Sequence, residues 1–239
     1  MTTVTSLSRL CVSIARRTVD EALPAATAAG RTADMIEIRL DALRDRNTAM
    51  AAVNSLPAAV ATPLLFTNRA AWEGGEAREP EQQRLAPLLA ALADNRAWVD
   101  IELRTAPDLR RQVIAAARRE SADDSRVIVS WHDFAATPDA ATLRAILREQ
   151  HESGADVGKM VTMARSPLDV LRVLALQEQA AELDFPLIAF CMGESGKISR
   201  LATCLLGGFM TYAAEDDGAA TAPGQLPAST LRQLEQLLQ

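Results

Sequence analysis

The chain has 239 residues, and 49% of them are hydrophobic, which is enough to fill the core of one large globular domain. The formal net charge of -6 at pH 7 and the lack of any run of five basic residues exclude a general binder of nucleic acid or anionic membranes. A small-molecule partner is favoured. The sequence has no apolar stretch of membrane-spanning length and no signal-peptide pattern, so we expect a cytoplasmic protein.

Eight short apolar runs rich in β-branched residues predict β-strands, and Ala/Leu/Arg/Glu-rich stretches with helical spacing separate them. The helical stretches include 80–95 and 137–154, and Thr137, directly before Pro138, is the expected N-cap of the second. The predicted strands are 10–14, 35–40, 63–69, 97–103, 126–132, 157–164, 186–193 and 208–214.

These strands begin 22 to 34 residues apart, a spacing that fits one strand and one helix per unit. Eight such units predict a closed (β/α)8 barrel of the TIM type, with residues 1–239 forming a single catalytic domain. The alternative is a doubly wound open sheet, but the glycine-rich turn expected after its first strand is missing. The irregular stretch 215–229 follows the last strand, where a lid over the barrel end is expected.

The alternation of polar and apolar residues predicts where charged side chains gather. Side chains of barrel strands point alternately inward and outward, and active sites lie at the C-terminal ends of the strands. Apolar residues at 36, 38 and 40 leave a charged inner face, and the run 98–104 repeats the pattern. The polar residues expected to converge inside the barrel are Glu37, Arg39, Asp41, Arg69, Asp100, Glu102, Arg104, His132 and Lys159.

Lys159 lies in the middle of an apolar strand, where a charged ammonium is costly to bury. Desolvation and neighbouring arginines would lower the pKa of such a lysine toward neutrality. A neutral amine can attack a ketone, whereas an arginine stays protonated and cannot. The pattern therefore favours a carbonyl substrate, although a solvated lysine and a Glu37–Arg39 ion pair without chemistry would have the same sequence.

The remaining reactive residue types do not form a metal-binding pattern. Cys11, Cys191 and Cys204 have no CxxC spacing and lie in apolar sequence, which predicts buried free thiols. The two histidines, His132 and His151, lack metal-ligand spacing. We expect no zinc site.

Seven motifs in order along the chain resemble those of the type I 3-dehydroquinate dehydratase family, the Schiff-base enzymes of the shikimate pathway. The resemblance spans nearly the whole chain. The motifs are EIRLD (37–41), NRAAWEGG (68–75), DIEL (100–103), SWHDF (130–134), ADVGKMVTMA (155–164), MGESGKISRL (192–201) and TAPGQ (221–225).

The resemblance implies a catalytic role for three residues. Lys159 would form an imine with the C3 ketone of 3-dehydroquinate. His132 would remove a proton from C2 and then help the C1 hydroxyl leave as water, giving 3-dehydroshikimate. Glu73 would orient His132.

The resemblance also implies the substrate contacts. Arg200 would bind the carboxylate, because a guanidinium pairs bidentately with that group. Glu37, Arg39 and Arg69 would hold the ring hydroxyls, and Thr221 and Gln225 would close over the ligand. Thr221 stands where the family commonly has serine. The family further implies a homodimer and no cofactor.

Two other functions fit parts of the pattern. A class I aldolase also forms an imine on a barrel lysine, but the acidic EDDG segment after the eighth strand is unsuited to a phosphorylated sugar. A non-catalytic sensor of a sugar acid could keep the same cavity without turnover. Biosynthetic and quinate-degrading roles involve the same chemistry and are not separated by the sequence.

Overall fold

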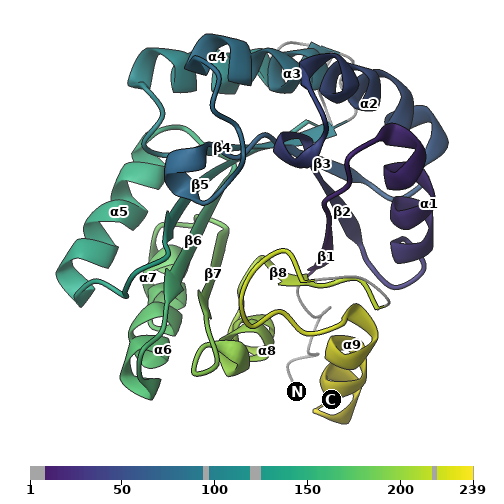
Figure 1. Ribbon diagram of the computed structural model, residues 1–239. Coiled ribbons are helices and arrows are strands. Elements are labelled where there is room, and N and C mark those ends of the chain that lie inside the picture. The colour runs from purple at the N-terminus through teal and green to yellow at the C-terminus, as the bar shows by residue number, and fades with distance from the viewer. Residues whose placement is uncertain (1–8, 94–96, 119–124, 217–219, 239) are drawn as a thin grey trace.

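Eight parallel strands form a nearly closed barrel in the computed structural model of the protein, with helices around it (Figure 1). The structure describes residues 9–93, 97–118, 125–216 and 220–238. The strand order is β7-β6-β5-β4-β3-β2-β1-β8, and a backbone hydrogen bond from Phe209 to Leu187 O (2.9 Å) links the two edges. The strands are β1 (Arg9–Ile14), β2 (Met35–Arg39), β3 (Leu64–Thr67), β4 (Ala97–Glu102), β5 (Val127–Asp133), β6 (Val157–Met163), β7 (Leu187–Met192) and β8 (Met210–Ala213).

Helices follow the strands and cover the outside of the barrel (Figure 1). The predicted (β/α)8 barrel is confirmed, and the open doubly wound alternative is wrong. No helix of the described residues is long and apolar enough to cross a membrane. The helices are α1 (Val19–Ala29), η1 (Leu40–Ala42), α2 (Arg46–Ala59), η2 (Ala71–Glu73), α3 (Glu81–Ala93), α4 (Pro107–Ala116), α5 (Ala140–Glu152), α6 (Pro167–Leu174), α7 (Leu176–Glu182), α8 (Lys197–Leu205) and α9 (Ala228–Leu237).

The two faces of each strand build two separate hydrophobic layers. Ile36 and Ile38 belong to the larger layer between strands and helices, which also contains Leu56 of α2. Leu65 and Ile188 belong to a smaller layer inside the barrel. The predicted alternation is therefore confirmed, and it leaves the inner face near the C-terminal strand ends to the polar residues.

Two charged residues expected on the inner face lie elsewhere because their strands end earlier than predicted. β2 ends at Arg39, so Asp41 lies in the 3-10 helix η1 and forms a bidentate pair with Arg39 (2.9 and 2.6 Å). β4 ends at Glu102, and Arg104 is exposed at the rim, with its guanidinium 5.0 Å from the Trp131 ring centroid.

The predicted N-cap of α5 is also wrong. Asp139 caps this helix, since its carboxylate accepts a hydrogen bond from the backbone N–H of Thr142 (2.8 Å). A carboxylate at this position also interacts favourably with the helix dipole. The hydroxyl of Thr137 instead donates to the carbonyl of Met163 (2.9 Å), which ties the start of this connection to β6.

A buried arginine joins α3 to the barrel. The Arg84 guanidinium donates to Glu102 Oε2 (2.7 Å), to the Asn68 carbonyl (2.8 Å) and to the Thr105 hydroxyl (3.0 Å). Arg84 is only 1% exposed, and these bonds replace the hydration of its two terminal nitrogens. Arg84 thereby fixes Glu102, which in turn contacts the candidate site.

We predict that Arg84→Met lowers the free energy of unfolding by about 3–5 kcal/mol, because it leaves a buried carboxylate without one of its partners. Arg111→Met is the matched control. Arg111, like Arg84, pairs with a carboxylate, but both Arg111 and its partner Asp108 are exposed. This control should cost less than about 1 kcal/mol. Urea unfolding of both variants measures the difference, and equal losses would contradict this role of Arg84.

Candidate active site

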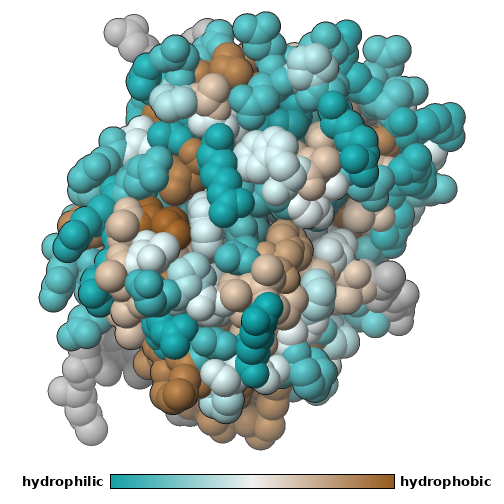
Figure 2. Space-filling model, turned by 60° about the vertical axis from the view of Figure 1, so that its left-hand side comes forward, coloured by the Kyte–Doolittle hydropathy of each residue, from teal (hydrophilic) through white to brown (hydrophobic). Residues whose placement is uncertain are grey.

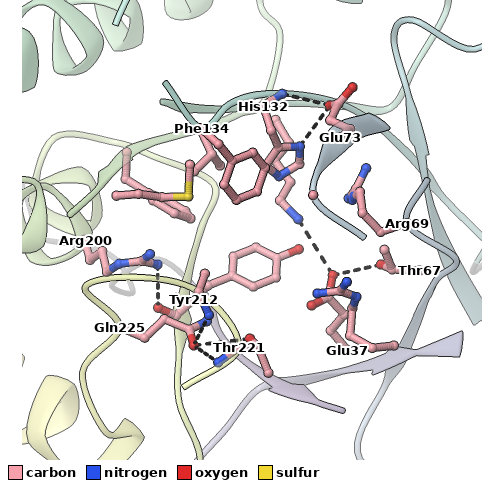
Figure 3. A pocket seen from close by; sticks show the side chains of 17 residues that line it. Glu37, Thr67, Arg69, Glu73, His132, Phe134, Arg200, Tyr212, Thr221 and Gln225 are labelled. Atoms are coloured by element: carbon pink, nitrogen blue, oxygen red, sulfur yellow. Dashed lines mark hydrogen bonds and ion pairs between the residues drawn. The ribbon is translucent and has the colours of Figure 1, made fainter. Parts of the chain in front are cut away.

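A cavity lies at the C-terminal end of the barrel, and its polar side chains converge from different strands (Figure 3). The nine residues that the family resemblance assigns to catalysis and substrate binding all line this cavity. The lining residues are Glu37, Arg39, Thr67, Arg69, Glu73, Gly74, His132, Phe134, Lys159, Val161, Phe190, Met192, Arg200, Tyr212, Thr221, Ala222 and Gln225.

Lys159 is buried on β6 and lies between two carboxylates. Its Nζ is 2.9 Å from Asp100 Oδ2 and 3.7 Å from Glu37 Oε1. The prediction that arginines are the neighbours of this lysine is wrong for its direct contacts, because these groups carry the opposite charge. The ammonium must therefore give up a proton within this carboxylate cluster before the amine can attack a carbonyl carbon.

Asp100 connects Lys159 to Arg69. Its Oδ1 accepts hydrogen bonds from Arg69 (2.7 Å) and from the Ser130 hydroxyl (2.6 Å), while Oδ2 faces Lys159. Burial disfavours the ionised form of Asp100, but the adjacent Arg69 and Lys159 outweigh it and hold its pKa well below the usual range. Asp100 was predicted to point inward, yet its contact with the lysine could not be deduced from the sequence.

Arg69 lies just beyond β3 and is held on several sides. Its guanidinium donates to Glu102 (3.0 Å) and Ser130 (2.7 Å) as well as to Asp100. The backbone here is tightly packed, because a Cβ on Gly75 would lie 2.0 Å from the Arg69 carbonyl oxygen. This requirement explains a glycine at the second position of the Gly74–Gly75 pair.

His132 and Glu73 form a pair beside Lys159. Glu73 Oε1 accepts a hydrogen bond from the His132 backbone N–H (2.8 Å) and lies 3.0 Å from His132 Nδ1. Oε1 thus acts as an acceptor, so Nδ1 carries a proton and Nε2 is left with a free lone pair. Glu73 comes from the short helix η2, which ends at Gly74 in the left-handed conformation (φ 81°).

The environment keeps the His132 imidazole neutral. Burial, followed by the positive charges of Arg69 and Lys159, lowers the pKa of His132 well below its ordinary value of 6.5. Burial also raises the pKa of Glu73 to about 8, against the opposing effect of Arg69. A protonated Glu73 can carry its proton on Oε2 and still accept at Oε1, so the orientation of His132 is the same in both states of the carboxyl group.

Arg200 lies at the other end of the cavity from Glu37 and Arg69 (Figure 3). It is fully buried on α8, and its guanidinium donates to the carbonyls of Tyr212 (3.2 Å) and Pro223 (3.3 Å). Among the described residues no carboxylate pairs with it, and its Nε has no hydrogen-bond partner. Burial lowers the pKa of Arg200 to about 10, so it remains a cation at neutral pH and lacks an anion.

Thr221 and Gln225 belong to the segment that follows β8 and covers the cavity beside Arg200. Gln225 Oε1 accepts hydrogen bonds from the Thr221 backbone (2.7 Å) and hydroxyl (3.2 Å), which closes a compact turn. A Cβ on Gly224 would lie 2.7 Å from the Gly193 carbonyl oxygen, so the segment packs directly on the loop after β7. The predicted lid position agrees with this arrangement.

Other lining residues carry no motif that identifies them in the sequence. Tyr212 and Phe190 enter the cavity from β8 and β7, and only their position on the inner strand face could have marked them. The three cysteines are free and buried, as predicted. Across the described ranges, no group of His, Cys, Asp and Glu side chains is arranged to hold a metal ion.

Comparison with known proteins identifies the family. The model of the type I 3-dehydroquinase family matches residues 10–239. The 3-dehydroquinate dehydratase of Desulfotalea psychrophila is 40% identical over 225 residues, which cover 94% of this chain and 95% of the relative. The enzyme of that name from Methanosarcina barkeri is 37% identical over 216 residues, covering 89% and 88%.

Solved structures agree with the sequence comparison. The 3-dehydroquinate dehydratase of Geobacillus kaustophilus superposes with a TM-score of 0.88 at 31% identity, covering 98% of this chain and 91% of that one. The type I enzyme of Clostridium difficile, solved with covalently modified comenic acid, has a TM-score of 0.87 at 26% identity, covering 98% and 92%. With matches along nearly its whole length, the chain belongs to the type I 3-dehydroquinase family.

Proposed function

We propose that the protein is a 3-dehydroquinate dehydratase of the shikimate pathway, which eliminates water from 3-dehydroquinate through an imine on Lys159. The observation that carries this proposal is the position of Lys159, whose amine lies in the same cavity as a neutral His132. The covalently modified ligand in the Clostridium difficile relative supports a route through a covalent intermediate in this family.

In the proposed reaction Lys159 passes a proton to the neighbouring carboxylate cluster, and the neutral amine attacks C3 of the substrate. The hydroxyl of the resulting carbinolamine takes that proton back and leaves as water, which gives an iminium ion. Nε2 of His132 then takes a proton from C2, and the electron pair left on carbon moves toward the iminium nitrogen. The enamine expels the C1 hydroxyl, which receives the proton from His132 and leaves as water. Hydrolysis of the new iminium frees Lys159 and releases 3-dehydroshikimate.

Glu73 supports this sequence as a positioning residue. It holds Nδ1 of His132 and leaves Nε2 facing the cavity, and the buried pair cannot rotate freely. The lowered pKa of His132 keeps the base unprotonated at neutral pH, and the protonated imidazole formed by C2 proton removal is correspondingly acidic. It therefore returns the proton readily to the departing hydroxyl.

The charges at the two ends of the cavity support one orientation of the substrate. Arg200 lacks an anion and would bind the C1 carboxylate, and Arg69, Arg39 and Glu37 at the opposite end would hold the ring hydroxyls (Figure 3). Thr221 and Gln225 would cover the bound ligand from the segment after β8. In this orientation the C3 ketone lies between the two ends of the cavity, close to Lys159.

We also propose that residues 1–239 act as a single catalytic domain in the cytoplasm and form a homodimer. Free buried cysteines fit a reducing compartment. Exposed apolar side chains on α6 and α8 support the dimer: Leu168 and Leu171 are 67% and 63% exposed, and Ile198 is 60% exposed. Figure 2 shows apolar side chains gathered at the lower edge of the molecule, at the height where Figure 1 places these helices.

We predict that Lys159→Met lowers kcat for 3-dehydroquinate by on the order of 10⁴-fold or more, because the imine route is lost and no other group replaces the nucleophile. Lys197→Met is the control, since Lys197 pairs with the exposed Glu194 outside the cavity. The control should keep wild-type kcat and KM. A steady-state assay of product absorbance measures both, and wild-type turnover by Lys159→Met would disprove the proposed mechanism.

We predict that His132 stays neutral at pH 6.5 and gains a proton only well below it. The variant His151→Gln leaves His132 as the single histidine, so its ring resonance can be followed by NMR during a pH titration. Because the folded pKa is below the unfolded value of about 6.5, the unfolded chain binds more protons as the pH falls below 6.5, and stability declines there. A midpoint at or above 6.5 would contradict the assignment.

A further inference from the structure

Tyr212 lies at the centre of the cavity and contacts the proposed nucleophile. It is on β8, opposite Cys11 of β1, and its ring points inward from the strand. The Lys159 Nζ is 4.1 Å from the centroid of this ring, and the Phe190 ring is 6.0 Å away on the neighbouring side. The aromatic face therefore stabilises a positive charge on the lysine nitrogen.

The hydroxyl of Tyr212 has no function in this packing. A phenylalanine would present the same ring face to Lys159 and the same edge to Phe190. Tyr212 is only 3% exposed, and among the described residues its hydroxyl oxygen has no hydrogen-bond partner. Buried hydroxyls are nearly always paired, so an unpaired one that lines a cavity points to a partner carried by the ligand.

The nearby acceptor groups of the protein bond to donors other than Tyr212. Glu37 accepts hydrogen bonds from the hydroxyls of Thr67 (2.8 Å) and Ser13, and it faces Lys159 at 3.7 Å. Asp100 is shared by Arg69, Ser130 and Lys159. The Tyr212 hydroxyl therefore takes no part in this network, in which the Glu37 oxygens still have lone pairs for a ligand hydroxyl.

We infer that the Tyr212 hydroxyl is a specificity-determining group, and that it binds the C4 hydroxyl of the substrate. This inference rests on the proposed function, because Arg200 must hold the C1 carboxylate. C1 and C4 are opposite each other across the six-membered ring. In Figure 3 the Tyr212 hydroxyl points away from Arg200, toward the end of the cavity formed by Glu37 and Arg69.

Donor and acceptor roles match in this arrangement. The C4 hydroxyl would donate to the Glu37 carboxylate, which can only accept, and would accept from the Tyr212 hydroxyl. Burial and the nearby Glu37 raise the pKa of Tyr212 well above its ordinary value, so the phenol remains a donor throughout the working pH range. C4 is bonded to the C3 carbon that reacts with Lys159, so this contact also positions the ketone.

The test compares wild-type protein and Tyr212→Phe on 3-dehydroquinate and on its 4-deoxy and 5-deoxy analogues. The variant should lose about five- to tenfold in kcat/KM on 3-dehydroquinate and on the 5-deoxy analogue, the size of one neutral hydrogen bond. It should equal the wild type on the 4-deoxy analogue, which has no group for Tyr212 to bind. Its melting temperature should not fall, because it loses only an unpaired buried hydroxyl.

Phe190→Leu is the packing control, since it alters the neighbour of the Tyr212 ring without removing a hydroxyl; it should affect all three substrates alike. Equal activity of Tyr212→Phe and wild type on 3-dehydroquinate would overturn the inference, as would an equal loss on the 4-deoxy analogue. If the wild type itself fails to convert 3-dehydroquinate, the proposed function fails instead, so the two failures are distinguishable.

Discussion

The ion pair between Asp100 and Lys159 is the interaction on which the rest of the cavity depends. Asp100 holds the ammonium at 2.9 Å and holds Arg69 at 2.7 Å, and Arg69 in turn contacts Glu102. Asp100 and Glu102 lie on β4, Lys159 lies on β6, and Arg69 lies just beyond β3, so the charges connect three segments of the barrel. Removing the carboxylate would take the closest charged partner from both the nucleophile and Arg69.

The energies of such a network are large but nearly cancel. At 2.9 Å and an effective dielectric constant of about 20, a pair of unit charges attracts by roughly 6 kcal/mol, while each buried ion loses several kcal/mol of hydration. The network thus contributes little net stability to the fold. Its main effect is to fix the position of Lys159 and Arg69, which a covalent mechanism requires. Arg200 lies outside this network and pairs with no carboxylate of the described residues, so a bound carboxylate would complete the charge balance of the cavity.

Most of the fold followed from the periodicity of the sequence. Eight β-branched runs at regular intervals predicted the eight strands, and the two-residue alternation placed Glu37 inside the barrel and Ile36 outside it. Strand ends were less predictable, because residues beyond a strand no longer obey the alternation, as Arg104, two residues after β4, shows. Thr137 was chosen as a helix cap because it precedes a proline, but the carboxylate of Asp139 competes better for the free N–H groups.

The site was predictable where a motif marks it, and not where only contact distances define it. The nine expected residues share one cavity because parallel strands end at the same rim. The sequence did not indicate that carboxylates contact Lys159. The alternation along a strand shows on which face a side chain lies, but not which side chains it meets across the barrel. The sequence also did not indicate Tyr212, whose unpaired hydroxyl is apparent only when every nearby donor and acceptor has been placed.

The most direct test of the central claim is to trap the covalent intermediate. The protein is mixed with 3-dehydroquinate and reduced with borohydride, and the modified peptide is located by mass spectrometry. The account predicts a single adduct on Lys159, with part of the population already lighter by one water because elimination precedes reduction. An unmodified Lys159 in a protein that demonstrably binds the ligand would contradict the account and favour a non-catalytic sensor of the same sugar acid.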